Sequence, residues 1–307
     1  QVIETLRRYR ILRETEVHRL CFPTVKDQRK VQERLKKLSE EGYVGRRFPP
    51  VVPAREGANG ATALEVAYWV ERSGVERVLG SPLDDAHQER LKINRNLSKW
   101  KDHRLTHPLD VSAVRACLEL AIGATPGIEL AVWYDEHDRD AEGLLLQRKV
   151  LIPYGDSGRE GPFTLRADAC FVLEEPRTGR QQLFFVEVDE GTESARKRWK
   201  EQRVPAYRAY LGQGFEEDFE FHGQGFRVLT VTRSRAGKDN AKRKKNLVGA
   251  TYRAGGRGQF LVATFDQVMP EGMVTGERFL AGEIWQRARL AEMKGGVEVA
   301  LRGELFQ

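Results

Sequence analysis

The sequence of 307 residues contains little cysteine and no long apolar run. Its three cysteines (Cys21, Cys117 and Cys170) are far apart, lie in apolar contexts and show no CxxC spacing. This pattern indicates reduced core residues rather than a disulfide framework or a zinc site. No apolar run approaches the length of a membrane span, and the N-terminus has no apolar signal-peptide segment. The composition therefore predicts a cytoplasmic protein without a membrane partner.

Two catalytic motifs are also absent. The six histidines are scattered, and no two of them flank a single apolar residue. This excludes the histidine-clustered metal site of tyrosine relaxases. There is no Gly-rich phosphate loop of the Walker kind, so the sequence predicts no nucleotide cofactor.

Positive charge is plentiful but unevenly distributed. Residues 1–55 contain 14 Lys and Arg against 7 Asp and Glu, and residues 235–257 contain 8 against one. The net charge of the whole chain is only +6, so the remainder is acidic. Two basic regions on an otherwise acidic chain favour a polyanionic partner, most often nucleic acid. Two solvated surfaces are the alternative interpretation.

The most informative segment is an apolar run, Leu183–Val186, that ends in acids. Successive strand residues face opposite sides of a sheet, so Glu187 and Asp189 share one face. A second expected strand, residues 163–173, carries Asp168 in its middle. Carboxylates in apolar strands are usually paired or bind a cation. Asp168 and Glu187 on neighbouring strands therefore predict a site for Mg²⁺ or Mn²⁺, the arrangement of a metal-dependent nuclease, although an acid at a strand end can also be purely structural.

Phosphodiester cleavage also benefits from a nearby cation, commonly a lysine two residues after the second acid. Position 189 is instead an aspartate. In one interpretation Asp189 is a third metal ligand and the next helix, residues 193–210, supplies Lys200 and Arg203. In the other, the site is degenerate and binds DNA without cutting it. Lys200 and Arg203 as solvated surface residues remain an alternative.

Residues 1–82 predict a winged helix-turn-helix domain. Helical spacing is found in residues 3–9, 15–20 and 26–39, and strands are expected at residues 43–48 and 63–70. In such modules the third helix enters the major groove of double-stranded DNA. A three-helix scaffold for dimerisation is the alternative. The predicted DNA-binding residues of the two basic regions are Lys26, Arg29, Lys30, Arg34, Lys37, Arg46, Arg47, Lys242, Arg243, Lys244 and Lys245.

The rest of the chain predicts an α/β domain. Residues 83–106 are expected to form a linker helix and a candidate contact of a homodimer. Residues 107–269 alternate helical and strand patterns, which is typical of a mixed sheet flanked by helices. Residues 270–307 are a C-terminal extension, with a helix expected near residues 282–293.

Several motifs resemble the replication-relaxation family of plasmid and mobile-element proteins. They include Leu6-Arg-Arg-Tyr-Arg-Ile-Leu12, Tyr68-Trp-Val-Glu-Arg-Ser-Gly-Val75, Ala167-Asp-Ala169 and Phe185-Val-Glu-Val-Asp-Glu-Gly-Thr-Glu-Ser194. The resemblance covers roughly residues 1–235. It implies a restriction-endonuclease-like domain, of the PD-(D/E)xK type, in which Asp168, Glu187 and Asp189 form the metal site. Where the family tends to have a lysine, this sequence has Arg203.

The expected function is that of a DNA-binding protein that nicks or relaxes DNA in replication or mobilisation, with a metal-dependent nuclease domain. The first alternative is a catalytically inactive replication initiator or transcriptional regulator that uses its nuclease-like domain for assembly. A partner-binding adaptor in conjugation is a further alternative.

Overall fold

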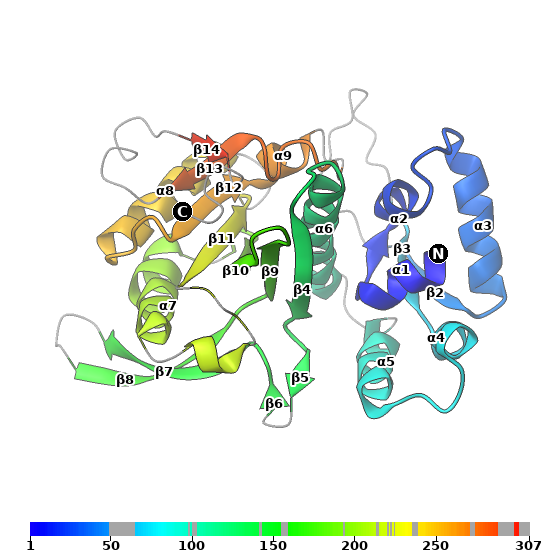
Figure 1. Ribbon diagram of the computed structural model, residues 1–307, viewed down its shortest axis with the longest axis horizontal. Coiled ribbons are helices and arrows are strands. Elements are labelled where there is room, and N and C mark those ends of the chain that lie inside the picture. The colour runs from blue at the N-terminus through cyan, green and yellow to red at the C-terminus, as the bar shows by residue number, and fades with distance from the viewer. Residues whose placement is uncertain are drawn as a thin grey trace. The chain divides into compact units, whose positions relative to one another are not determined.

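The computed structural model describes most of the chain (Figure 1). The described residues are 1–48, 65–97, 99, 103–140, 143–154, 159–192, 194–212, 215–219, 221, 223, 225–234, 239–270, 274–287 and 298–300. The chain forms two compact units: unit 1 comprises Gln1–Cys117 and Glu271–Val274, and unit 2 comprises Leu118–Pro270 and Thr275–Gln307. The domain boundaries predicted from the sequence stay predictions.

Unit 1 combines helices with a small antiparallel sheet. Its elements are α1 (Val2–Arg8), β1 (Leu12–Arg13), α2 (Glu14–Cys21), α3 (Gln28–Glu40), β2 (Val44–Arg47), β3 (Ala67–Val70), α4 (Arg72–Leu79), α5 (Asp85–Leu97) and most of α6 (His103–Gly123). The strand order is β1-β3-β2. Residues 49–64 lie outside the described residues; they comprise the segment between the two predicted wing strands and the first two residues of the second predicted strand.

The apolar spacing of α3 explains how this helix packs. Val31 and Leu35, four residues apart, are buried, while the Lys and Arg side chains of this helix are exposed. Asp27 caps the helix, since its side chain accepts a hydrogen bond from the backbone N–H of Arg29 at 3.0 Å. Glu14 of α2 binds the amides of Gln28 and Gln32 at 3.0 and 2.7 Å. These contacts fix α3 against α2 with its basic side outward.

Unit 2 is built on a mixed sheet of seven strands in the order β14-β13-β12-β11-β10-β9-β4. The strands are β4 (Glu129–Asp135), β9 (Ala169–Glu175), β10 (Arg180–Asp189), β11 (Phe226–Thr232), β12 (Phe260–Thr264), β13 (Glu283–Arg287) and β14 (Glu298–Ala300). The pairs β10–β11 and β11–β12 are parallel, and the other pairs are antiparallel. Mixed α/β architecture is therefore confirmed for this unit.

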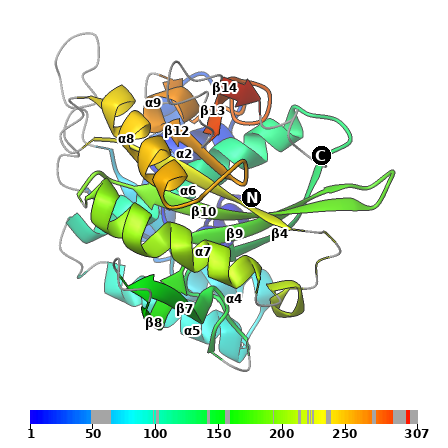
Figure 2. The same ribbon diagram turned by 90° about the vertical axis from the view of Figure 1, so that its left-hand side faces the viewer.

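The π-helix η2 (Ala195–Arg203), α7 (Val204–Leu211) and the short η3 (Phe215–Asp218) connect β10 to β11, and α8 (Asn240–Arg253) connects β11 to β12. Figure 2 shows α7 and α8 on one face of the sheet. The short helix α9 (Phe265–Val268) follows β12. Two ribbons complete the unit: β5 (Arg139–Asp140) with β6 (Gly143–Leu144), and β7 (Gln147–Tyr154) with β8 (Arg159–Arg166).

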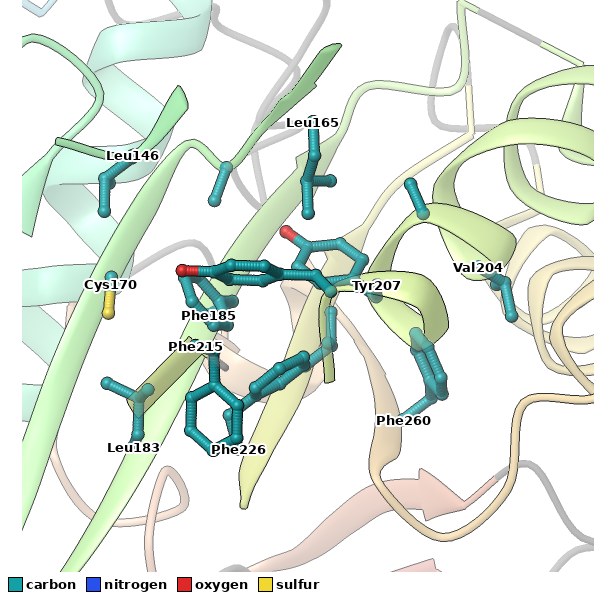
Figure 3. Close-up of a cluster of buried hydrophobic side chains, with 14 of the residues drawn as sticks. Leu146, Leu165, Cys170, Leu183, Phe185, Val204, Tyr207, Phe215, Phe226 and Phe260 are labelled. Carbon is teal, nitrogen blue, oxygen red and sulfur yellow. The ribbon is translucent and has the colours of Figure 1, made fainter. Parts of the chain in front are cut away.

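The core between the sheet and these helices is rich in aromatic rings (Figure 3). The ring of Phe185 lies 4.9 Å from that of Phe226 and 5.6 Å from that of Tyr207, and Tyr207 lies 6.2 Å from Phe260. Burying each such ring contributes roughly 1.5–3 kcal/mol to folding. This core sets the position of Tyr207, whose hydroxyl points toward the end of β10.

Two of the predicted elements are wrong. The strand expected over residues 163–173 is broken, because β8 ends at Arg166 and pairs with β7 in a separate ribbon, whereas β9 starts at Ala169 within the main sheet. The helix expected near residues 282–293 is wrong over residues 283–287, which form β13 on the edge of β12. There Ile284 and Trp285 are buried, so sheet pairing and burial outweigh the local helical pattern.

Candidate functional site

The three acids predicted to form the site are buried. Glu187 is 3% exposed, and Asp168 and Asp189 are each 9% exposed. Alternation along β10 puts Phe185, Glu187 and Asp189 on the face covered by the helices. The parallel register pairs Glu187 with Thr230 and Asp189 with Thr232 of β11. Three buried carboxylates require hydrogen-bond donors or positive charges that compensate for the loss of water.

Glu187 has two partners from one helical segment. The hydroxyl of Tyr207 on α7 donates a hydrogen bond to Oε1 of Glu187 at 2.6 Å, and Nη1 of Arg203 lies 3.0 Å from the same oxygen. The guanidinium of Arg203 also donates to the carbonyl oxygen of Arg166 at 2.5 Å. Arg203 thus ties the end of β8 to the acid on β10.

These contacts offset only part of the cost of burying Glu187. The pKa of Glu187 is raised to about 7: burial is the largest cause and the nearby Asp168 adds to it, while Arg203 acts in the opposite direction. Burial, together with the charge of Glu187, also raises the pKa of Tyr207 well above its usual value. A strongly perturbed carboxyl group beside a second acid is typical of functional sites.

Asp168 lies at the break between β8 and β9. Its Oδ2 accepts a hydrogen bond from the backbone N–H of Val188 at 2.7 Å, and its own N–H donates to the carbonyl of Val186 at 3.1 Å. Val186 and Val188 are the residues directly before and after Glu187. Asp168, at the break in the expected strand, is therefore held next to Glu187.

Asp189 is engaged elsewhere. Its Oδ1 lies 2.7 Å from Nη2 of Arg243, and its Oδ2 accepts from Nε of Arg243 at 2.7 Å and from the hydroxyl of Thr232 at 2.5 Å. Arg243 belongs to α8, 54 residues further along the chain. Sequence reasoning placed Arg243 on a DNA-facing surface and missed this pair.

The helical segment after β10 begins as a π-helix of nine residues, η2. Ser194 caps it, and it changes to an α-helix next to Pro205, which has no N–H to donate. Because π-helical hydrogen bonds join residues five apart, Arg198 and Arg203 lie on a similar side, and both interact electrostatically with Glu187. In the described part of the chain no contact joins Lys200 to the three acids.

The cations predicted to bind DNA fall into two groups. Those of α3 and its preceding turn (Lys26, Arg29, Lys30, Arg34 and Lys37) are all exposed, as is Arg46, whereas Arg47 is half-buried and donates to the carbonyl of Leu97 at 3.5 Å.

Of the four predicted DNA-binding cations on α8, only Lys242 and Lys245 are exposed. Arg243 turns inward to Asp189, and Lys244 is buried with its Nζ 2.8 Å from Gln267 Oε1 and 2.9 Å from the carbonyl of Ile284. Lys244, Leu247 and Val248 follow helical spacing, a signal that could have identified Lys244 as an inward residue. Lys242 and Lys245 are therefore the two predicted cations of α8 whose side chains are exposed to solvent.

The three predicted metal ligands are not gathered around one point. Among the described residues, no group of three or more His, Cys, Asp or Glu side chains is arranged to hold a metal ion. Asp168 and Glu187 do lie together, and Mg²⁺ commonly takes one or two carboxylates and completes its shell with water and substrate phosphates. A two-carboxylate site therefore fits this pair, whereas both oxygens of Asp189 are taken by Arg243 and Thr232.

Comparison with known proteins gives one match. The family model described as replication-relaxation matches residues 3–220, which include all of α3, β10 and α7. Neither a curated protein nor a solved structure matches the chain. Within the part of the chain that the structure describes, no helix combines the length and apolarity that crossing a membrane requires.

Proposed function

Since the chain belongs to the replication-relaxation family, we propose that it is a DNA-binding protein of a plasmid or mobile element that nicks and relaxes duplex DNA during replication or mobilisation. In this proposal, unit 1 is a winged helix-turn-helix domain that engages the DNA. Unit 2 is a restriction-endonuclease-like domain of the PD-(D/E)xK type that cuts one strand.

The observation that carries the proposal is the buried cluster around Glu187. Its carboxylate lies beside Asp168, contacts the guanidinium of Arg203 at 3.0 Å and accepts from Tyr207 at 2.6 Å, and its pKa is raised to about 7. Leaving two acids together in an apolar sheet destabilises a fold, so a function that needs them is the natural explanation.

Asp168 and Glu187 are the residues that would hold Mg²⁺ or Mn²⁺. Such an ion activates water and neutralises charge on the phosphate. Arg203 contacts Glu187 and would supply a fixed positive charge that stabilises the phosphodiester, which is the role that a lysine usually has in such sites. Tyr207 orients the carboxylate of Glu187 through its hydrogen bond. Because Tyr207 is fully buried, we do not assign it the role of a nucleophile.

The DNA-binding part of the proposal is supported by α3. This helix carries exposed cations on its outer side and is fixed to α2 through Glu14. The antiparallel pair β2–β3 follows it and carries the exposed Arg46. A basic helix followed by a two-stranded wing is the arrangement by which winged modules contact the major groove and the adjacent backbone.

The nuclease proposal is tested by relaxation of supercoiled plasmid with Mn²⁺. We expect the wild-type protein to convert supercoiled plasmid into the relaxed form and Glu187→Ala to lose this activity, because Glu187 is the central acid of the site. Glu201→Ala removes an exposed carboxylate from the nearby η2 and should keep the activity. Relaxation that survives Glu187→Ala would eliminate the proposed site.

Metal binding is measured in the same proteins without DNA. Mn²⁺ should raise the melting temperature of the wild type and leave that of Glu187→Ala unchanged, since ligands stabilise the state that binds them. An equal rise in both proteins would place the ion elsewhere.

The DNA-binding proposal predicts that charge reversal on α3 weakens binding. Arg29→Glu combined with Lys30→Glu should raise the dissociation constant for duplex DNA by roughly tenfold or more and lower the salt dependence by about two phosphate contacts. Arg72→Glu combined with Arg77→Glu makes the same change of charge on the exposed side of α4. If the two double variants have the same dissociation constant for DNA, the net charge of the protein and not the position of the cations on α3 determines the affinity.

A second function is favoured by the arginine partners of the acids. Arg203 neutralises Glu187 and Arg243 neutralises Asp189 without a metal ion. A nuclease-like domain whose charges are compensated internally suits an inactive replication initiator or regulator. In that case the wild type would bind DNA with strong salt dependence and relax no plasmid, which the relaxation assay distinguishes.

A further inference from the structure

The carboxyl end of β10 carries an acid at a position where phosphate chemistry favours a cation. Glu187 and Asp189 lie on the same face, two residues apart, and each meets an arginine from a different helical segment: Arg203 of η2 and Arg243 of α8. The sites of the two arginines are therefore adjacent along one strand. Arg203 supplies the positive charge beside Glu187, and Arg243 of α8 adds a second positive charge beside Asp189.

The geometry of the Asp189–Arg243 pair holds the guanidinium in one orientation. Two parallel contacts of 2.7 Å join Nε and Nη2 of Arg243 to the two carboxylate oxygens, and Thr232 holds the carboxylate at 2.5 Å. The side chain of Arg243 is 13% exposed. Within the described residues, no partner is recorded for its third nitrogen, Nη1, which leaves one edge of the guanidinium for a ligand.

The surroundings of this pair carry charges of both signs. Arg233, at the end of β11, donates its backbone N–H to the carbonyl of Asp189 at 3.0 Å, lies 3.6 Å from Glu190 and stacks over Phe265 at 5.1 Å. Lys242 and Lys245 of α8 are exposed, but neighbours one and two residues from Arg243 do not share its face of the helix. The acids Glu190, Asp239 and Asp266 lie at the same edge, so the positive charge that a phosphate would meet is that of the exposed edge of Arg243 itself.

We propose that Arg243 is a phosphate-binding residue for the DNA backbone and that Asp189 is its positioning residue rather than a metal ligand. This inference rests on the proposed function, since it assigns the DNA phosphate to the same site. A guanidinium already fixed by a carboxylate loses little conformational freedom when its remaining edge meets a phosphate oxygen. Together Arg203 and Arg243 would contact the backbone on either side of Glu187.

The test is the salt dependence of binding to a short fluorescein-labelled duplex of mixed sequence. Arg243→Gln should weaken binding roughly tenfold and reduce the slope of log Kd against log salt by about one contact. Arg243→Lys should keep the slope and lose part of the affinity, since the charge remains but the paired contact with Asp189 does not. Asp189→Asn should likewise weaken binding with the wild-type slope.

Arg253→Gln is the matched control, because it removes the same charge from the exposed far end of α8. If Arg243→Gln and Arg253→Gln bind alike, or if Arg243→Gln lowers the melting temperature while the slope stays at the wild-type value, the pair is structural and the inference is wrong. A wild-type protein that binds the duplex without salt dependence would instead overturn the proposed function, and this inference with it.

Discussion

Replacing Arg13 with alanine is expected to destabilise unit 1 by about 3–5 kcal/mol. The guanidinium of Arg13 is buried and contacts Glu16 and Asp110 at 2.8 Å each and the carbonyl of Leu109 at 3.2 Å. The side chains of Glu16 and Asp110 are 0% and 1% exposed. Burial raises the pKa of Glu16 even with Arg13 in place. Without Arg13, both buried carboxylates would lose the positive charge that it supplies.

Urea unfolding, combined with hydrogen exchange of peptides from α1 and α2, measures this effect within unit 1. Lys36→Ala provides the comparison, since it removes one cation from the exposed Lys36–Glu40 pair, whose atoms lie 3.8 Å apart. That change should alter stability by less than about 1 kcal/mol. Equal effects of the two substitutions would mean that the buried cluster contributes no more than a surface ion pair.

Glu187 is expected to make the stability of unit 2 fall as pH rises from about 4.5 to about 7. The pKa of Glu187 is raised from an unfolded-state value of 4.5 to about 7, chiefly by burial. Below both values the carboxyl group is protonated in both states. Between them the unfolded chain releases its proton while the folded chain retains it, so unfolding becomes more favourable with pH. The loss is on the order of 3 kcal/mol and is complete above pH 7.

The variant Glu187→Gln isolates this effect because glutamine does not titrate. The stability of the wild type relative to the variant should decline across this pH range, in buffers with a chelator, and then level off. Urea unfolding of both proteins at several pH values measures the difference. Curves that stay parallel from pH 4.5 to 8 would show that Glu187 does not titrate with a raised pKa.

Much of the local structure could be predicted from the sequence. The helices α1, α3, α4 and α7 and the strands β10, β11 and β12 follow apolar spacing that depends only on neighbouring residues. The shared face of Glu187 and Asp189 follows from strand geometry alone. Two features could not be predicted in this way. The strand breaks before Ala169 because β8 pairs with β7, and residues 283–287 form a strand because they pair with β12.

The sequence by itself determined which segments are apolar, which side of α3 is basic and that Glu187 and Asp189 end an apolar strand on one face. Only the tertiary structure decided the partners of those acids: Arg203 and Tyr207 for Glu187, the backbone of Val188 for Asp168 and Arg243 for Asp189. The physical reason is that periodicity assigns a side chain to a face but not to a neighbour. Neighbours are chosen when distant segments pack together, and a buried charge then requires whichever countercharge that packing brings within reach.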